Sequence, residues 1–500
     1  MHLGMLLEMA AEGMPDRVAI GSRADGMTFG ELAAGARQVA ALFAAAPGER
    51  VGLLDLNSPA VPLTLFGSAI AGKPFVPVNY RLTDEQLAAI VTRMAPAALV
   101  VGEGMAERLG TIDGITLIPR KQVLDVAGDT GAGQLAETDV DPDDPAVLLF
   151  TSGTTGEPKA AVLRHTNLVS YIISTVEFAG AGEDEAALVS VPPYHVAGVS
   201  SVLSTTYCGR RVVHLEAFEP RRWVDLARTE QITHAMVVPT MLGRILDVLD
   251  EDGEGIASLR ALSYGGGPMP LTVIERAMTV LPEVDFVNAY GLTETSSTIS
   301  VLGPEDHRAA FGSDDPQIRA RLGSVGRPLP SVEVSIRDPL GRECAAGEHG
   351  EIWVRGAQVS GEYLGRKGVD EDGWFNTRDS GHFDDGGYLF VHGRLDDVIV
   401  RGGENLSPGE IEDVLLRHPA VAEVAVVGIP DTEWGEKVVA AVVLHPGAEA
   451  EESELREHVR VRLRSTRTPE RIDIRQALPY TETGKLLRRT LREELSVKFG

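Results

Sequence analysis

Residues 144–159 read DPAVLLFTSGTTGEPK, a short apolar run followed at once by a polar, glycine-rich loop. The run has the length and composition of a buried strand. The loop from Thr151 to Lys159 combines glycines, hydroxyl side chains and a lysine, and glycine lets backbone N–H groups approach phosphate oxygens. This stretch therefore predicts a phosphate cradle at the end of a strand. An ordinary polar loop is the alternative. A Walker A loop is excluded because Glu157 and Pro158 separate the second glycine from the lysine.

The chain on both sides of this loop continues an α/β pattern up to about residue 395. Helical apolar spacing at 31–46 precedes an apolar run at 50–56, and a helix at 82–95, with Thr83 as its cap, precedes a strand at 97–102. Short strands with glycine and aspartate turns follow between 340 and 400.

The last hundred or so residues predict a compact α+β unit, in which the helix 407–418 is followed by two strands and another helix. We therefore expect an α/β protein with a large N-terminal domain of several subdomains over 1–394. A small α+β domain should occupy 395–500, joined near GRLDD (393–397).

Composition narrows the function classes. The 500 residues carry a net charge of -27, which argues against binding to nucleic acid or to an anionic membrane surface. The N-terminus lacks the basic segment of a secretory signal, and no run approaches the roughly 20 apolar residues of a membrane span. Cys208 and Cys344 lack metal-site spacing and predict packing residues in a cytoplasmic protein. Only seven of the 46 basic residues are lysine, and Lys159 and Lys485 both lie in glycine-rich loops.

Four more motifs follow the phosphate loop: YGGGPMP (264–270), NAYGLTET (288–295), GRLDDVIVRGGENLSPGEIE (393–412) and PYTETGK (479–485). In order and spacing they resemble the adenylate-forming enzymes, which include acyl- and aryl-CoA synthetases, luciferases and peptide-synthetase adenylation domains. The resemblance covers nearly the whole chain. It implies that a carboxylate attacks the α-phosphate of ATP, that pyrophosphate leaves, and that a thiol then takes the acyl group.

The resemblance assigns an ATP site. It places the phosphates of ATP against Thr151, Ser152, Gly153, Thr154, Thr155, Gly156 and Lys159. It places adenine between Gly265, Gly266, Gly267 and Tyr290, and it counts Asn288, Ala289 and Gly291 among the ATP-binding residues. The ribose would meet Asp379 of WFNTRDSG (374–381) and Arg394, although Arg378 stands where many members of the family have glycine. Glu294 would ligate Mg²⁺, and Thr293 would lie near the α-phosphate.

The small domain would serve both half-reactions by turning. Lys485 would reach the α-phosphate and the carboxylate during adenylation, and Asp396 resembles the hinge aspartate of relatives, with a turn carboxylate as the alternative. For the second step, Gly402 and Gly403 would leave room for the pantetheine arm of CoA, and Trp434 would stack on its adenine.

An arginine-rich stretch in the small domain includes Arg467 and could seat the CoA phosphates. A solvated amphipathic helix is the alternative. The loop STRTPER (465–471) departs from the more basic and aromatic version in aryl-CoA ligases.

PPYHVAG (192–198) resembles the segment beside the substrate carboxylate, so His195 is a candidate gate or orienting donor, with a core histidine as the alternative. The acyl pocket would be lined by Val196, Val199, Ser200, Met236 and Tyr264. Because this set offers no lysine or arginine for a second carboxylate, it favours a hydrophobic monocarboxylic acid with an aromatic, alicyclic, branched or medium-length acyl group.

The leading hypothesis is an acyl-CoA synthetase dependent on ATP and Mg²⁺, with CoA as co-substrate. One alternative is a stand-alone adenylating enzyme that loads an acyl carrier protein. The other is a non-catalytic scaffold, against which the presence of Lys159, Glu294, Asp379, Arg394 and Lys485 together argues. We expect no nucleic acid partner and no integral membrane association, and we leave homodimerisation open.

Overall fold

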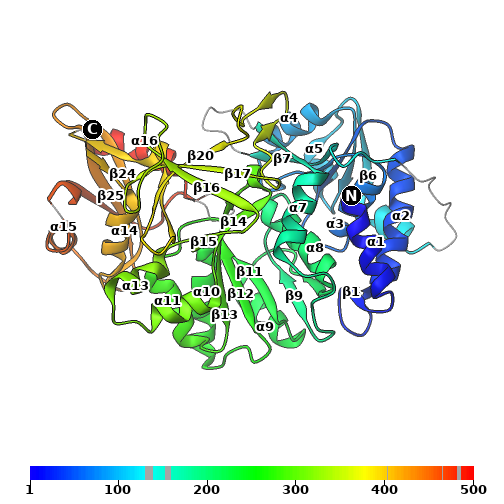
Figure 1. Cartoon of the computed structure of the whole chain (residues 1–500), viewed down its shortest axis with the longest axis horizontal. Coiled ribbons are helices and arrows are strands. Elements are labelled where there is room, and N and C mark those ends of the chain that lie inside the picture. Colours follow the sequence, from blue (N-terminus) through cyan, green and yellow to red (C-terminus); the bar gives the residue numbers. More distant parts are fainter. Residues whose placement is uncertain (130–138, 152–158, 403, 464, 481–485) are drawn as a thin grey trace.

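The computed structural model describes residues 1–129, 139–151, 159–402, 404–463, 465–480 and 486–500. Within these ranges the N-terminal part contains two large mixed sheets (Figure 1). The first has the order β15-β14-β13-β12-β11-β9-β10-β1-β2. Its strands are β1 (Val18–Ile20), β2 (Met27–Thr28), β9 (Ala186–Val189), β10 (Arg211–His214), β11 (His234–Val237), β12 (Ala261–Gly265), β13 (Asp285–Leu292), β14 (Ser297–Leu302) and β15 (Arg327–Pro328).

The second large sheet has the order β19-β18-β8-β7-β4-β3-β5-β6. Its strands are β3 (Arg50–Leu54), β4 (Phe75–Pro77), β5 (Ala97–Val101), β6 (Ile115–Pro119), β7 (Pro145–Thr151), β8 (Lys159–Arg164), β18 (Glu362–Tyr363) and β19 (Arg366–Lys367). The predicted strand at the phosphate loop is β7, in the middle of this sheet, and its residue Val147 pairs with Phe75 of β4.

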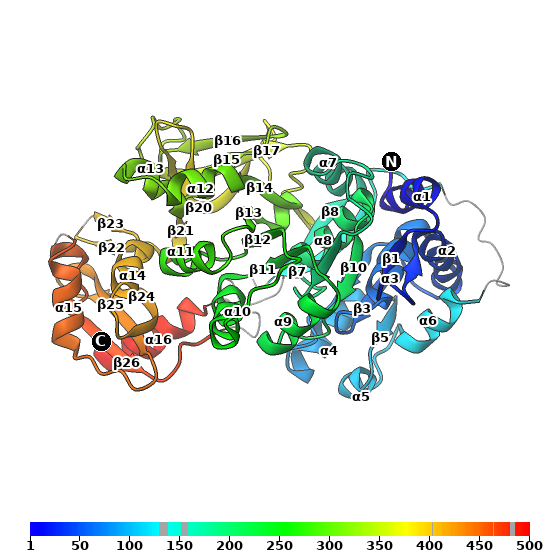
Figure 2. The ribbon, with the colours of Figure 1, turned by 90° about the horizontal axis from the view of Figure 1, so that it is seen from below.

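Helices cover both faces of each large sheet. One core cluster joins both sheets to α1 (Leu3–Gly13), α2 (Phe29–Ala45), α3 (Ala60–Ile70), α6 (Arg120–Ala127), α7 (His165–Thr175) and α8 (Val196–Cys208). A second lies under α9 (Pro220–Thr229), α10 (Pro239–Asp252), α11 (Leu271–Val280) and α12 (Pro304–Phe311), with α13 (Pro316–Ala320) following. A third lies under α4 (Asp84–Met94) and α5 (Met105–Leu109). Figure 2 shows α1, α2 and α3 gathered beside β1 and β3.

A smaller antiparallel sheet follows, with the order β16-β17-β20-β21. Its strands are β16 (Val332–Arg337), β17 (Gly350–Gly356), β20 (Phe375–Phe383) and β21 (Leu389–Arg394). Short 3-10 turns mark η1 (Thr293–Thr295), η2 (Arg321–Gly323), η3 (Leu395–Asp397) and η4 (Ser465–Arg467). The segment between 340 and 400 therefore contains the short strands that the sequence predicts.

The C-terminal unit forms a separate lobe at the left of Figures 1 and 2. Its sheet runs β23-β22-β25-β24, with β26 beside β25. The elements are β22 (Ile399–Arg401), β23 (Glu404–Leu406), α14 (Pro408–Leu416), β24 (Val421–Asp431), β25 (Gly435–Leu444), α15 (Glu452–Arg460), β26 (Arg471–Arg475) and α16 (Arg488–Phe499).

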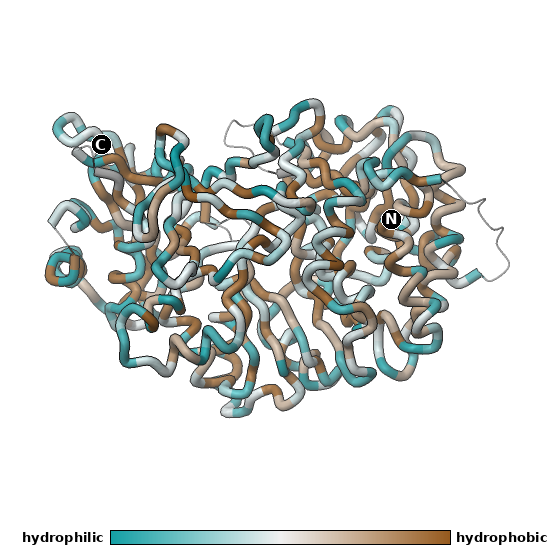
Figure 3. Tube along the Cα trace, in the orientation of Figure 1, coloured by the Kyte–Doolittle hydropathy of each residue, from teal (hydrophilic) through white to brown (hydrophobic). Residues whose placement is uncertain are grey.

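Alternate residues of β25 supply the two cores of this lobe. Val438, Ala440 and Val442 pack with α14 and α15, whereas Val439 and Ala441 pack with α16. The strand is buried on both faces, so it reads as a continuous apolar run. Figure 3 shows the same pattern across the molecule, with hydrophobic segments along inner strands and hydrophilic segments at peripheral turns.

The α/β fold class with a large N-terminal and a smaller C-terminal domain is confirmed. Thr83 caps α4 as predicted, with reciprocal hydrogen bonds to Gln86. The helix predicted at 31–46 begins earlier, at Phe29, because Thr28 accepts from the Glu31 N–H and donates its own N–H to that glutamate. Cys208 and Cys344 are free thiols. None of the helices in the described ranges is long and apolar enough to cross a membrane.

Candidate functional site

The strands that flank the phosphate loop are paired to its very base. β7 and β8 run antiparallel, with Thr151 opposite Lys159, whose side chain is exposed. The predicted phosphate contacts Ser152, Gly153, Thr154, Thr155 and Gly156 lie outside the described residues. The structure thus fixes the two ends of the loop where β7 ends and β8 begins, at that edge of the second sheet.

Glu294 lies beside this edge. It sits in η1, directly after β13, and its backbone carbonyl accepts hydrogen bonds from the N–H groups of Ser360 and Gly361. Tyr363 of β18 donates its hydroxyl to the Glu294 carboxylate at 2.6 Å, and Tyr363 pairs with Ala161 of β8. The predicted metal ligand therefore lies one strand away from the phosphate loop.

The Tyr363 contact also tests the carboxylate as a metal ligand. Burial raises the pKa of the Tyr363 phenol, and the neighbouring Glu294 raises it further, so the phenol stays protonated and donates to the Glu294 carboxylate. A carboxylate oxygen held in this way is a ligand type that Mg²⁺ prefers. Glu294 is partly exposed, and its donor chemistry fits the metal that the adenylate-forming resemblance implies.

A second charged group, Asp379 with Arg394, lies in the smaller antiparallel sheet and contacts Tyr290 of the first large sheet. In the register of β20 and β21, Asp379 lies opposite Arg394, and the Arg394 Nε is 3.1 Å from Asp379 Oδ1. From β13, the Tyr290 hydroxyl donates to Asp379 Oδ2 at 2.5 Å. Burial raises the pKa of Tyr290, and the Asp379 charge adds to this. Residues predicted to hold adenine and ribose are thus in direct contact.

Arg378 adopts the backbone conformation that glycine favours. Its φ is +61°, in the left-handed region, and its N–H donates to Asn376 Oδ1 at 2.7 Å. The next N–H, that of Asp379, donates to Thr377 Oγ1 at 3.1 Å. The departure from the glycine of many relatives therefore leaves the turn geometry intact, with an L residue in a conformation that is unfavourable for it.

The glycine motif 265–267 and Gly291 lie at the ends of neighbouring strands. A Cβ on Gly265 would be 2.3 Å from the Ala289 carbonyl oxygen, and one on Gly291 would be 1.8 Å from the Ser297 carbonyl oxygen. Gly266 has a φ of +80°. Asn288 donates its side-chain amide to the Ser324 carbonyl at 3.0 Å, which ties β13 to η2. A Cβ on Gly267 would meet no atom within 4 Å, so its face is open to a ligand.

The predicted acyl-pocket residues fall into two groups. His195 is exposed at the start of α8, 5.0 Å from the Tyr194 ring, so its side chain is not in the core. Val199 packs in the core between the sheets, and Ser200 donates to Ser297 Oγ at 3.3 Å. Val196 is partly buried against the same core.

Tyr264 is not gathered with this group. In the parallel pairing of β11 and β12, Met236 lies opposite Ser263, whereas Tyr264 lies opposite Val237. Because side chains alternate along a strand, Met236 and Tyr264 face opposite sides of the sheet. The Tyr264 ring is 0% exposed, and its hydroxyl lies 2.8 Å from His307 Nε2 within the core under α10 and α11.

Two of the predicted CoA residues, Gly402 and Trp434, are in contact in the C-terminal lobe. Gly402, with a φ of +57°, donates its N–H to the Trp434 carbonyl at 2.8 Å, and a Cβ there would meet the indole at 3.0 Å. The indole is 46% exposed. Arg401 lies over it at 5.7 Å and donates to the Thr466 carbonyl at 2.9 Å. Gly403 lies outside the described residues.

The arginines near this cluster are largely engaged by carboxylates. Arg467 pairs with Glu410 at 2.6 Å, Arg460 with Glu457 at 2.6 Å, and Arg471 with Glu452 at 3.0 Å. The basic stretch therefore presents less unpaired positive charge than its sequence indicates.

Two predicted residues of the turning domain are less defined. Lys485 lies outside the described residues; its flanks Tyr480 and Leu486 form an antiparallel bridge. Asp396 lies in η3, in the crossing between β21 and β22.

Two residues were missed by the sequence reasoning. Tyr363, which holds Glu294, lies in a two-residue strand, and no pattern marks it. Arg401 directly precedes the predicted Gly402, and an arginine beside the paired glycines was a signal that could have been used.

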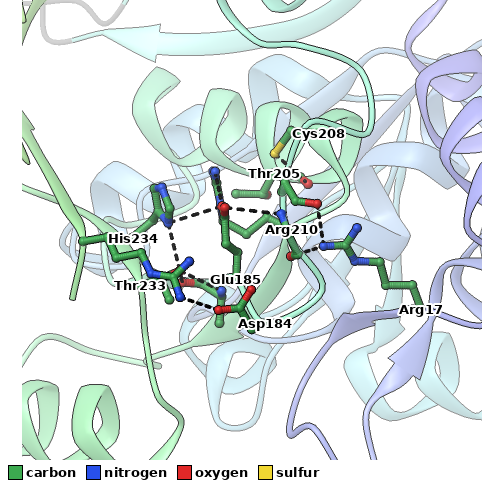
Figure 4. A network of polar contacts seen from close by, with 12 residues as sticks. Arg17, Asp184, Glu185, Thr205, Cys208, Arg210, Thr233 and His234 are labelled. Atoms are coloured by element: carbon green, nitrogen blue, oxygen red, sulfur yellow. Dashed lines mark hydrogen bonds and ion pairs between the residues drawn. The ribbon is translucent and has the colours of Figure 1, made fainter. Parts of the chain in front are cut away.

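A separate polar network lies at the amino ends of the parallel strands of the first sheet (Figure 4). Glu185 accepts hydrogen bonds from Arg210 at 2.7 and 2.9 Å, and His234 Nδ1 is 3.6 Å away. Burial opposes ionisation of Glu185, but the Arg210 hydrogen bonds outweigh it and lower its pKa. Ligands of open α/β sheets bind at the carboxyl ends of strands, so this network is structural.

Comparison with known proteins agrees with the geometry. Residues 7–364 match the model of the AMP-binding enzyme family, and residues 410–485 match the AMP-binding enzyme C-terminal domain. The chain belongs to the AMP-binding enzyme family. It therefore shares the adenylate-forming fold and ligase chemistry of that family, as the five motifs predict.

Three relatives place the chain within the AMP-binding enzymes. A fatty acid–[acyl-carrier-protein] ligase of Streptomyces coeruleorubidus is 34% identical, with 90% of this chain and 87% of that protein covered. A feruloyl-CoA synthase of Amycolatopsis is 33% identical, with 97% and 96% covered. The o-succinylbenzoate coenzyme A synthetase of Bacillus subtilis, solved with ATP and a magnesium ion, is 29% identical with a TM-score of 0.81, covering 97% of this chain and 98% of that one.

Proposed function

We propose that this AMP-binding enzyme is an ATP- and Mg²⁺-dependent acyl-CoA synthetase for a hydrophobic monocarboxylic acid. The observation that carries the proposal is the contact of Tyr290 with Asp379, which is paired with Arg394, because Tyr290 lies on β13, the strand that leads into Glu294. Asp379 offers carboxylate oxygens beside Arg394 for ribose hydroxyls, and Glu294, held by Tyr363, offers carboxylate oxygens for a metal ion.

The first half-reaction joins two anions, so its main demand is electrostatic. Asp379 would accept hydrogen bonds from the ribose hydroxyls while Arg394 stays paired with one of its oxygens. The loop from Thr151 to Lys159 would hold the β- and γ-phosphates, and Glu294 would hold Mg²⁺, which neutralises phosphate charge when bound. The acid carboxylate would then attack the α-phosphorus. The bond between the α-phosphorus and the oxygen that bridges it to the β-phosphorus breaks, and pyrophosphate leaves.

The second half-reaction transfers the acyl group to the thiol of CoA, with AMP as the leaving group. We propose that residues 1–394 and 395–500 are the two domains and that the smaller one pivots at Asp396. Support comes from the sheets: β21 and β22 belong to different sheets, and only residues 395–398 separate them. Lys485 would face the adenylation site first, and the surface at Gly402 would follow.

Free CoA is the favoured acceptor because Trp434 presents an exposed ring beside Arg401 and Gly402. An aromatic face next to a guanidinium suits a nucleotide base. A carrier protein is the second candidate. Two observations favour it. Arg460, Arg467 and Arg471 are ion-paired, which leaves fewer guanidinium groups to bind the CoA phosphates, and one relative is a fatty acid–[acyl-carrier-protein] ligase.

The acid class is supported by the small and aliphatic residues of α8 and by Met236, and the hydroxyl of Ser200 is engaged by Ser297. His195, exposed at the helix start, would orient the carboxylate. Feruloyl and fatty acyl groups, which two relatives activate, both fall in this class. A cytoplasmic location and a homodimer complete the proposal, and size-exclusion chromatography with light scattering tests the latter.

The deciding experiment incubates the protein with MgATP, CoA and a pooled panel of aromatic, alicyclic and aliphatic acids. Mass spectrometry reads AMP, acyl-adenylates and acyl-CoA. Acyl-CoA from one subset supports the proposal and names the acid class. Acyl-adenylate alone favours the carrier-protein alternative, and absence of AMP with every acid contradicts the proposal.

A variant separates the two half-reactions. Lys485→Ala should lose adenylation by a large factor yet still form the thioester from a supplied acyl-adenylate, because only the first step needs that charge. Equal loss of both steps would remove Lys485 from its assigned role.

A further inference from the structure

Three histidines outside the adenylation site meet on one face of the smaller antiparallel sheet. His349 directly precedes β17, His382 lies in β20 and His392 lies in β21. Because Gly350 pairs with Gly381, the adjacent His349 and His382 become cross-strand neighbours. One potential ligand atom from each of the three lies within 4.8 Å of the other two.

The three imidazoles are stacked almost parallel. The ring centroids of His349 lie 4.9 Å from those of His382 and 4.5 Å from those of His392, with interplanar angles of 9°. His382 Nδ1 is 2.7 Å from His392 Nε2, so one of these nitrogens donates to the other. Within the part of the chain that the structure describes, the hydrogen bond between His382 and His392 is the one that joins ring nitrogens of this group, so packing alone does not account for three clustered imidazoles.

Burial in this cluster lowers the pKa of two of the three rings, those of His382 and His392. Burial, with smaller contributions from the neighbouring His349 and His382, lowers the pKa of His392 to about 3, and the pKa of His382 is also lowered, mainly by burial. Neutral imidazoles are the ligating form. His349 is exposed, so an ion could reach the group from solvent.

We propose that His349, His382 and His392 form a binding site for one divalent transition-metal ion of the Zn²⁺ type. Three imidazoles with one coordination position left for water match a known Zn²⁺ arrangement. With Zn–N bonds of about 2.0–2.1 Å, two tetrahedral ligand atoms lie about 3.4 Å apart. The nearest pair, 2.7 Å apart, must therefore open by less than about 1 Å, and ligand atoms up to 4.8 Å apart must close by up to about 1.4 Å. The shared proton moves to the far nitrogen of its ring, so that both rings stay neutral. Mg²⁺ prefers oxygen ligands, so this ion differs from the one assigned to Glu294.

The site lies next to the crossing between the two domains. The His392 carbonyl accepts a hydrogen bond from the hydroxyl of Ser407, which precedes α14, at 3.0 Å. Arg394, which pairs with Asp379, lies two residues further along β21. An ion bound here would link the start of β17 to β20 and β21 and stiffen the strand that leads into the crossing.

The test uses the untagged full-length protein, stripped with EDTA and dialysed, with no ATP and no Mg²⁺, so that its result does not depend on the proposed activity. Isothermal titration with Zn²⁺ should give one equivalent, and Co²⁺ should give the visible absorption of a four-coordinate site. His349→Gln should weaken Zn²⁺ binding by at least about 100-fold, because removal of a supporting residue alone costs about 10–100-fold. His445→Gln, which changes an exposed histidine of another domain, should leave it unchanged.

His382→Gln is the second variant, and circular dichroism with a melting curve shows whether it folds. If it does not fold, His349→Gln still decides the question, because that side chain is exposed on a turn before β17. Loss of the equivalent in the folded variants supports the site. Zn²⁺ binding that is equal in wild type and His349→Gln, or absent in wild type, overturns it.

Discussion

Tyr290→Phe removes the hydroxyl that holds Asp379 and keeps the ring that the proposal places against adenine. The hydroxyl donates to Asp379 Oδ2 at 2.5 Å. A hydrogen bond to a charged group contributes about 1.5–3 kcal/mol. Because Arg394 still lies 3.1 Å from the other carboxylate oxygen, we take the lower end. About 1.4 kcal/mol is a factor of ten in binding, so the KM for ATP should rise roughly tenfold.

The assay is ATP–pyrophosphate exchange at saturating acid, which reports only the first half-reaction. Tyr388→Phe is the matched control, because Tyr388 donates to Asp306 Oδ1 at the same 2.5 Å. Both variants should lose comparable thermal stability, but only Tyr290→Phe should change the KM for ATP. An unchanged KM in Tyr290→Phe, with stability reduced as in the control, would show that the bond is structural and refute its assigned positioning of the ribose contact.

Four further outcomes test other parts of the structure. Trp434→Ala should raise the KM for CoA by a factor that corresponds to about 1–3 kcal/mol of lost binding free energy, because base stacking is lost, and it should not change ATP–pyrophosphate exchange; a change in exchange would contradict its role. Arg378→Gly should melt no lower than wild type, whereas Arg378→Val should lose about 1–2 kcal/mol, since its φ of +61° is left-handed; equal melting of the two would contradict the strain. Arg210→Met should lower the unfolding free energy by about 2 kcal/mol in urea, because the half-buried Glu185 loses its partner; an unchanged urea midpoint would contradict this. Burial lowers the pKa of His307 to about 4 from 6.5, so the unfolded chain binds a proton first as pH falls, and stability should decline from pH 6.5 toward pH 4. Urea midpoints at several pH values measure that decline, and a His307→Gln variant should show a shallower one.

Local sequence signals predicted the elements well and the contacts between them less well. The cap at Thr83 and the strand before the phosphate loop depend on neighbours in sequence, and both are confirmed. The pairing of Asp379 with Arg394 depends on the register of one hairpin, and the motif resemblance placed both at the ribose.

Contacts between residues far apart in the sequence do not follow from local sequence patterns. Tyr363 reaches Glu294 from a two-residue strand whose position is set by pairing with β8, and no local pattern encodes that pairing. Met236 and Tyr264 are both predicted to line the acyl pocket. The alternation of side chains separates them, and the face that each occupies follows only from the register of β11 and β12.

The short crossing between β21 and β22 sets an effective concentration. A chain extends by at most about 3.5 Å per residue, so residues 395–398 span at most about 14 Å. The C-terminal lobe therefore cannot move far from the proposed adenylation site. If it pivots as proposed, its two functional faces compete for one position, and each is presented at the concentration that this tether imposes. A longer flexible tether lowers that concentration roughly as the −3/2 power of its length. Inserting glycine and serine residues here should therefore slow both half-reactions together, even though no binding residue is altered.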